Sequence, residues 1–413
     1  MVRWNVSLAS ALAPAGAWPA ELGGARFFIS GIRGLGKVSF WRTKCLRRAF
    51  VPVASKIPQP RLGTPDPRLS ETEFRARFLS QFSDPAFDAL RYELDRVAAV
   101  AWDAYDHGRK APRTRKAGAG FADPEYDLSL DWIAARDAIR AAQARHEDPA
   151  APASILLISA SARSEHTCPG EMSKSYRLVQ IAREVISAAP NTESEVLELH
   201  RLAAEYGRHI HPCKACFSTA APLCRWPCSC YPNYGSGQTQ DWMNEIYPMW
   251  VRAHGVIIVT PVNWYQVSSP LKLMMDRLVC ADGGNPDPTL THGKDAKRAK
   301  EVELDGWDYP RHLKGRLFSV IVHGDVEGVE NVRRSVADWL RYMHLVPAGT
   351  LAELDRYIGY WEPYATSHDA LDADTAMQEE VRNAARTLLE AVQASRAGQQ
   401  IAAGSGLKPV RQK

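Results

Sequence analysis

No run of about 18 consecutive apolar residues occurs in this chain of 413 residues, so the sequence predicts no membrane-spanning helix. The glycine-rich G-x-G-x-x-G motif and the Walker motif are also absent, so no dedicated dinucleotide or triphosphate fingerprint is present. Acids are scarce in residues 1–60, which hold nine basic residues and one acid, Glu21, a net charge of +8. Since the whole chain carries +4, the remainder carries 4 − 8 = −4. That balance gives no reason to expect nucleic-acid or membrane binding by the folded part.

The first 65 residues lack a sustained hydrophobic period, because Gly and Pro interrupt their short apolar pieces. We expect residues 1–65 to be a disordered or poorly structured basic extension. The first 20 residues have two alternative interpretations. A signal peptide requires an apolar stretch, which two prolines interrupt here. An organelle transit peptide is poor in acids, as this segment is. We favour an extension without a targeting signal, and we therefore expect a cytoplasmic protein.

Residues 66–150 show helical patterns. Ser70 and Glu73 form a capping box, Asp84 before Pro85 marks a second helix start, and a third helix is predicted from Ser129 to about Ala144. These helices contain no cluster of residues typical of a catalytic or binding site. We therefore favour a helical layer packed on the next domain over a lid or a dimer contact.

From Ser154 onward, short β-branched runs alternate with helical stretches, which indicates a parallel sheet covered by helices on both faces. The predicted strands are 155–159, 195–199, 256–260 and 317–322, with a fifth between Leu345 and Leu351. The predicted helices are 173–189, 239–253, 268–281, 328–344 and 375–394. This is an α/β, flavodoxin-like three-layer fold over residues 151–395, with a five-stranded parallel sheet of order 2-1-3-4-5 after the N-terminal helical extension. A disordered tail is expected over 396–413, and the polar insertion 282–316 has no assigned role.

The loop after the first of these strands has the chemistry of a phosphate site. A phosphate dianion needs several donors at a helix N-terminus, where unpaired amides and the positive dipole end converge. Hydroxyl, guanidinium and ammonium donors are available there from Ser161, Arg163, Ser173, Lys174 and Ser175. The alternative is an ordinary strand–helix loop with a serine cap.

The loop after the third strand has the chemistry of a site for a flat, polar-edged ring, which requires main-chain donors and an aromatic or apolar wall. Residues that meet this need are Pro261, Val262, Asn263, Trp264 and Tyr265, with Ser268 either facing the ring or capping the next helix. The loop after the fourth strand contributes His323, Gly324 and Asp325. In this fold, a ligand crevice lies between the loops after the first and third strands.

Three segments resemble the NADPH-dependent FMN reductase branch of the flavodoxin-like superfamily: ASAR at 160–163, Ser-Lys-Ser at 173–175 and TPVNWYQVSSPLKLMMDR at 260–277. The resemblance implies noncovalent FMN, NAD(P)H as hydride donor, and a homodimer or homotetramer. It implies no catalytic side chain, because the flavin N5 carries the chemistry, and no dinucleotide motif, because the nicotinamide binds transiently.

The expected activity is therefore an FMN-dependent NAD(P)H oxidoreductase whose final acceptor is a quinone, a nitro or azo compound, or free flavin. The alternative is an electron carrier or redox sensor of the flavodoxin or iron-sulfur flavoprotein type, without fast turnover of a small molecule.

Five of the eight cysteines cluster in one segment: Cys213, Cys216, Cys224, Cys228 and Cys230. Their separations of two, seven, three and one residues match neither the usual iron-sulfur spacing nor a paired zinc ribbon. Reduced structural or redox-buffering thiols, a zinc or iron-sulfur site and a disulfide-forming pair all remain open. No metal ligand is assigned.

Overall fold

The computed structural model describes residues 57–411, so the basic extension expected for residues 1–65 lies, except for its end, outside the described residues. Every helix in this range is too short or too polar to span a bilayer.

The predicted N-terminal helices are present. Helix α1 (Glu71–Leu79) begins at Ser70, and both hydrogen bonds of the capping box with Glu73 are formed. The 3-10 turn η2 (Pro85–Leu90) is capped by Asp84 and leads into α2 (Arg91–Asp106). A short antiparallel pair follows, β1 (Thr114–Lys116) with β2 (Asp127–Ser129), and then α3 (Leu130–Glu147). Helix α3 packs against α6 (Met243–Arg252) of the next domain.

A parallel sheet forms the centre of the next domain, which confirms the predicted fold class. Its strands are β3 (Ala153–Ser159), β4 (Thr192–Glu198), β5 (Gly255–Pro261), β6 (Leu317–Gly324), β7 (Val346–Pro347) and β8 (Glu353–Tyr357). Neighbours run in the order β4-β3-β5-β6, and both β7 and β8 pair with β6. The fifth strand predicted between Leu345 and Leu351 is thus divided in two. The Ala348 N–H still donates to the Phe318 carbonyl at 3.1 Å, and the chain then pairs with β6 again, as β8, only after the turn η7 (Thr350–Ala352).

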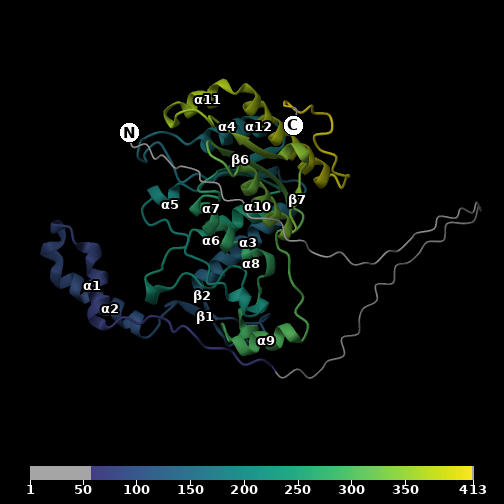
Figure 1. The fold of residues 1–413 in the computed structure, drawn as a ribbon. Coiled ribbons are helices and arrows are strands. Elements are labelled where there is room, and N and C mark those ends of the chain that lie inside the picture. The colour runs from purple at the N-terminus through teal and green to yellow at the C-terminus, as the bar shows by residue number, and fades with distance from the viewer. Residues whose placement is uncertain (1–56, 412–413) are drawn as a thin grey trace, which may run out of the picture. The chain divides into compact units, whose positions relative to one another are not determined.

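Helices cover both faces of the sheet (Figure 1). Side chains alternate along each strand, so Ile155 and Leu157 pack in one apolar cluster and Leu156 and Ile158 in the other. The first cluster lies beneath α4 (Lys174–Ser187) and α12 (Thr375–Arg396). The second includes residues of α3, α6 (Met243–Arg252), α7 (Ser269–Arg277) and α10 (Val329–Tyr342). The result is the predicted three-layer arrangement.

Two connections carry only short elements. Residues 199–242 contain α5 (Arg201–Ala204) and the 3-10 turns η3 (Cys216–Ser218), η4 (Ala221–Leu223) and η5 (Tyr234–Ser236). The insertion 282–316 follows α8 (Val279–Gly283) and contains η6 (Pro288–Thr291) and α9 (Ala296–Leu304).

Beyond β8, the turn η8 (Tyr364–Thr366) and α11 (Ser367–Ala373) precede α12. Residues 397–411, which follow α12, contact this helix and its N-cap. The Gly404 N–H donates to Glu390 at 2.8 Å, and Arg411 pairs with Asp374.

Candidate functional site

A cavity of about 490 Å³ opens at the carboxyl ends of β3, β5 and β6, which is where the sequence places a ligand crevice. Eleven of the fourteen predicted site residues line it: Ser161, Arg163, Ser173, Lys174, Ser175, Pro261, Val262, Asn263, His323, Gly324 and Asp325. The other three, Trp264, Tyr265 and Ser268, are outside this lining.

The β3–α4 loop turns its donors toward the cavity. The Ser161 hydroxyl accepts a hydrogen bond from the Arg163 N–H at 3.1 Å, which folds the start of the loop. The Arg163 guanidinium donates to the Pro169 carbonyl at 2.8 Å, so it spans the long loop between Arg163 and α4. Ser173 caps α4 by accepting from the Tyr176 N–H at 3.1 Å. The start of α4, with its positive dipole end, therefore faces the cavity.

A buried polar pair joins α4 to β6 beneath the cavity. Ser175 Oγ lies 2.7 Å from His323 Nε2, and both residues are buried. Burial, with Lys174 nearby, lowers the pKa of His323 to about 3, so the imidazole is neutral at physiological pH. Its Nδ1 atom is buried and has no hydrogen-bond partner within residues 57–411. A buried polar atom without a partner, in a residue that lines a cavity, is suited to a ligand.

Lys174 and Asp325 form an ion pair across the same wall, with Nζ and Oδ2 3.0 Å apart. The Lys174 side chain is 13% exposed, so it points along the cavity wall and not into solvent. Asp325 neutralises its charge, and Arg163 is consequently the lining cation without a paired carboxylate among the described residues.

The β5–α7 loop begins with a tight turn. Asn263 and Gln266 exchange two backbone hydrogen bonds of 2.8 and 3.0 Å, and the two residues between them adopt left-handed φ angles, 48° at Trp264 and 63° at Tyr265. Bulky residues rarely adopt this conformation, so the turn is strained. Trp264 is 93% exposed and Tyr265 57% exposed. Both aromatic rings are therefore presented to solvent next to the lining residue Asn263.

Ser268 acts as a helix cap. Its hydroxyl accepts from the Leu271 N–H at the start of α7 and donates to the Ala160 carbonyl at the end of β3. Of the two alternatives for Ser268, the structure shows the cap. The serine ties the second loop to the first.

Eight further lining residues were not predicted as site residues. They are Ala162, Pro169, Glu171 and Met172 in the β3–α4 loop, and Tyr364, Ala365, Ser367 and His368 in η8 and α11. His368 Nε2 lies 3.7 Å from Glu171 Oε1 and links these two groups. The second group follows β8 and is brought to the cavity only by the sheet, so no local motif could indicate it.

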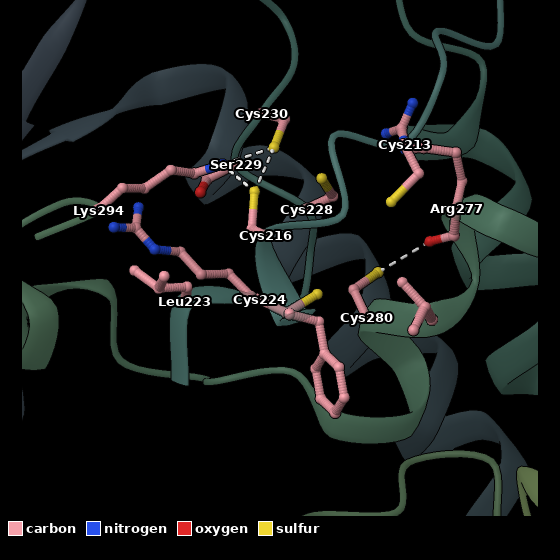
Figure 2. A pocket seen from close by; sticks show the side chains of 13 residues that line it. Cys213, Cys216, Leu223, Cys224, Cys228, Ser229, Cys230, Arg277, Cys280 and Lys294 are labelled. Atoms are coloured by element: carbon pink, nitrogen blue, oxygen red, sulfur yellow. Dashed lines mark hydrogen bonds between the residues drawn. The ribbon is translucent and has the colours of Figure 1, made fainter. Parts of the chain in front are cut away.

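The five clustered cysteines surround a second, small cavity of about 20 Å³ (Figure 2). Cys280 in α8, Arg225, Arg277 and Lys294 also line it. Across residues 57–411, no three or more His, Cys, Asp or Glu side chains are placed to hold a metal ion. The described cysteines are all free thiols.

The thiols of this cluster differ in acidity. Hydrogen bonds from Cys216 and Cys228 hold the pKa of the Cys230 thiol far below its usual range. The same bond to Cys230, followed by burial, raises the pKa of Cys216. Burial raises the pKa of Cys280 to about 12. Cys230 is thus the thiol of this cluster whose surroundings most favour the thiolate, because its neighbours act as donors to it.

Helix α7 connects the two cavities. It begins at Ser268 beside the larger cavity and ends at Arg277 beside the cysteines. Arg277 is buried and forms a bidentate ion pair with the buried Asp241, with contacts of 2.5 and 3.1 Å. The pair of Lys272 with Asp276 on the same helix is exposed and is an ordinary surface ion pair.

The model of a family described as NADPH-dependent FMN reductase matches residues 153–354. No curated protein matches the chain in sequence. Among solved structures, the chain is similar to RosB with a bound 8-demethyl-8-formylriboflavin-5'-phosphate intermediate, at 13% identity and a TM-score of 0.40, over 63% of this chain and 95% of RosB.

It is also similar to an NADH:FMN oxidoreductase in the apo form, at 13% identity, a TM-score of 0.32 and coverage of 62% and 96%. An azoreductase from Bacillus anthracis is similar at 13% identity, a TM-score of 0.31 and coverage of 56% and 98%.

Proposed function

We propose that the 490 Å³ cavity binds FMN for NAD(P)H oxidation, because residues 153–354 match the model of a family described as NADPH-dependent FMN reductase. The observation that carries the proposal is the convergence of the β3–α4, β5–α7 and β6–α10 loops on one cavity at the carboxyl ends of the strands. Its volume lies within the range of about 300–1,000 Å³ common for cofactor sites.

The first loop is suited to the phosphate of FMN. The start of α4 offers amide donors and a positive dipole end, and Ser161 and Ser173 offer hydroxyl groups, whereas the Ser175 hydroxyl is already bonded to His323. Arg163 supplies a guanidinium charge that no carboxylate neutralises among the described residues. Lys174 has a smaller share in the phosphate site, because Asp325 already pairs with it.

The other two loops are suited to the ring. Pro261 and Val262 supply apolar surface, and Asn263 supplies backbone and side-chain polar groups. The unpartnered Nδ1 of His323 is a further polar contact at the same wall. Gly324 is constrained by its neighbours, since a Cβ there would lie 3.1 Å from the Val326 carbonyl. These groups fix the orientation of a planar ligand and shield one side of it from water.

When bound, FMN supplies the hydride chemistry, so the side chains are left with binding and orientation. Neutral His323 can donate a hydrogen bond without adding charge to the site. The exposed rings of Trp264 and Tyr265 offer stacking surface to a planar acceptor beside the cavity. A quinone, a nitro or azo compound, or free flavin fits this description. We expect a homodimer or homotetramer, as the family implies.

The test is FMN binding followed by reduction. The full chain is mixed with FMN and the quenching of flavin fluorescence is measured; the bound flavin is then titrated anaerobically with NADH and with NADPH. We expect saturable quenching and rapid bleaching by at least one nicotinamide. A protein that fails to quench FMN fluorescence at millimolar concentration does not have this site. Flavin that bleaches only with a protein reductant would favour the electron carrier.

A further inference from the structure

Two segments have no part in the flavin site: the cysteine-rich segment 213–230 and the insertion 282–316. The structure brings them together (Figure 2). Cys216 Sγ lies 3.4 Å from Cys230 Sγ. Lys294, from the insertion, places Nζ 3.1 Å from Cys216 Sγ and closer still to Cys230 Sγ. An ammonium group that contacts two sulfur atoms stabilises negative charge on either of them, and so favours the thiolate form.

We propose that Cys216 and Cys230 form a redox-active dithiol that hydrogen peroxide oxidises to a disulfide, with Lys294 as the cation that holds the Cys230 thiolate. A disulfide requires about 2.05 Å between sulfur atoms, so the pair must approach by roughly 1.4 Å. Side-chain rotation at half-buried Cys216, in the short turn η3, is suited to that movement.

The charge around the pair favours the thiolate. Arg225 is buried and lines the same cavity, and its Nε and Nη2 atoms have no hydrogen-bond partner among the residues that the structure describes. The described residues that line this cavity include no acid. The nearest carboxylate partner of a lining cation is Asp241, which is committed to Arg277. Lys294 and Arg225 line the cavity, and Lys110 also lies close enough to Cys230 to favour negative charge on its sulfur.

The insertion holds Lys294 in place through its backbone. Gly293 has a left-handed φ of 81°, and its carbonyl accepts from the Thr291 hydroxyl at 2.9 Å. A Cβ at Gly293 would lie 2.8 Å from the Tyr126 hydroxyl. Only glycine satisfies both constraints without a local shift. The backbone of the insertion therefore positions the Lys294 ammonium group beside the cysteine segment.

The size of the cavity selects the oxidant. A volume of about 20 Å³ has room for little more than one water-sized molecule. Hydrogen peroxide approaches this size, whereas a peptide disulfide does not. Cys230 is itself buried, so a bulky disulfide cannot reach its sulfur without opening the segment.

The reaction proceeds in two displacements. The Cys230 thiolate attacks one peroxide oxygen, the O–O bond breaks, and a sulfenic acid and hydroxide form. The hydroxide takes the proton of Cys216 and becomes water. The Cys216 thiolate then attacks the Cys230 sulfur, the S–S bond forms, and the S–O bond breaks with loss of a second hydroxide. The two sulfur atoms lose two electrons in total, and peroxide is reduced to water and hydroxide.

The experiment uses the full chain, reduced and freed of reductant, without flavin or nicotinamide, so its outcome is separate from that of FMN binding. We expect limiting peroxide to remove two of the eight free thiols and to link the peptides of Cys216 and Cys230 in a non-reducing digest. Dithiothreitol restores both thiols. A disulfide reagent of large size reacts more slowly at this pair than peroxide does.

Variants separate this pair from its neighbours. C216S and C230S abolish the linked peptide, whereas the matched variant C213S, from the same segment and cavity, retains it. K294Q is expected to slow the oxidation of Cys216 and Cys230 by peroxide at neutral pH by at least about tenfold, because the cation sets the fraction of thiolate. K294R is expected to restore most of the oxidation rate. Circular dichroism identifies any variant that does not fold, and K294Q tests the proposal with every cysteine present.

Three outcomes overturn the proposal: peroxide links Cys230 to Cys213 or Cys224 as often as to Cys216; K294Q reacts at the wild-type rate; or the purified chain contains stoichiometric zinc or iron that these cysteines hold. The last outcome would establish a metal site instead of a dithiol.

Discussion

Ser175 Oγ and His323 Nε2 lie 2.7 Å apart although 148 positions separate the two residues in the chain. The bond joins the first turn of α4 to the end of β6 and is buried on both sides. In H323L the Ser175 hydroxyl loses its partner, and we expect the free energy of unfolding to fall by about 1–3 kcal/mol. Urea denaturation measures the loss.

A double-mutant cycle distinguishes this bond from a simple packing effect. The variant S175A/H323L is expected to lose less than the sum of the two single variants, because each single change already removes the shared bond. Additive losses would mean that the pair makes no interaction. The exposed His292, replaced by Ala, is the control and should change stability by less than about 0.5 kcal/mol.

Arg163 is the residue that we expect to contribute most charge to FMN binding. R163A should weaken FMN binding by about 1.5–3 kcal/mol, roughly 10- to 150-fold, the usual contribution of a hydrogen bond to a charged group. Fluorescence quenching measures the dissociation constant. The matched variant R183A removes an exposed arginine from α4, away from the cavity lining, and should leave it unchanged. Equal affinities for the two variants would exclude Arg163 from the phosphate site.

The strained turn at Trp264 and Tyr265 offers a test of where the acceptor stacks. Asn-Gly is the preferred pair for a turn with two left-handed residues, so W264N/Y265G is expected to stabilise the fold by about 1–2 kcal/mol. Loss of the exposed rings should raise KM for aromatic acceptors while the FMN dissociation constant stays constant. A variant that gains stability with unaltered KM would show that the rings do not contact the acceptor.

The ion pair of Asp241 with Arg277 should contribute more to the free energy of unfolding than an exposed pair does, because both side chains are buried. D241N leaves a buried guanidinium without its counter-charge, and we expect a loss of about 3–5 kcal/mol in thermal or urea unfolding. K272A breaks the exposed pair on the same helix and should cost less than about 1 kcal/mol. Similar losses in both variants would contradict the burial argument.

His254 is expected to make stability fall in acid. Its Nδ1 accepts from the Ser154 N–H at 3.0 Å and its Nε2 donates to the His146 carbonyl at 3.1 Å, so the buried ring has no free site for a second proton. Burial, together with His146, Arg396 and Arg316, lowers the pKa of His254 from its ordinary 6.5 to about 4.

Between these two values the unfolded chain binds a proton that the folded chain does not. The free energy of unfolding should therefore be unaffected by His254 above pH 6.5 and fall by up to about 1.4 kcal/mol per pH unit from 6.5 toward 4. H254N keeps an acceptor for Ser154 and removes the titration, so its urea midpoint should vary less with pH over this range. A parallel pH dependence in both proteins would assign the acid sensitivity to other groups.

Local signals in the sequence were sufficient for most of the fold. The Ser70 capping box and the apolar run that became β3 act within a few residues, and both were predicted correctly. The main part of the last strand was placed too early, because the chain pairs with β6 over its longer stretch only after the turn η7. A prediction from composition had no access to that contact.

The sites divide in the same way. The loops after β3, β5 and β6 could be identified because they follow recognisable strands, whereas Tyr364 and His368 follow a strand that was placed elsewhere. Five cysteines are visible in the sequence, but the approach of Lys294 to Cys230 joins residues far apart in the chain. Such contacts between residues far apart in the chain arise from tertiary packing, and no local pattern in the sequence indicates them.

Helix α7 is fixed at both ends, by Ser268 to the Ala160 carbonyl and by Arg277 to Asp241. Its nine residues span about 13 Å, and each added or deleted residue would rotate everything beyond it by about 100° and move it by 1.5 Å. Such a change would turn Arg277 away from its buried partner whenever the serine stayed in place. The number of residues in this helix is consequently as restricted as the identity of its ends, and homologues that keep both anchors should show neither insertions nor deletions between them.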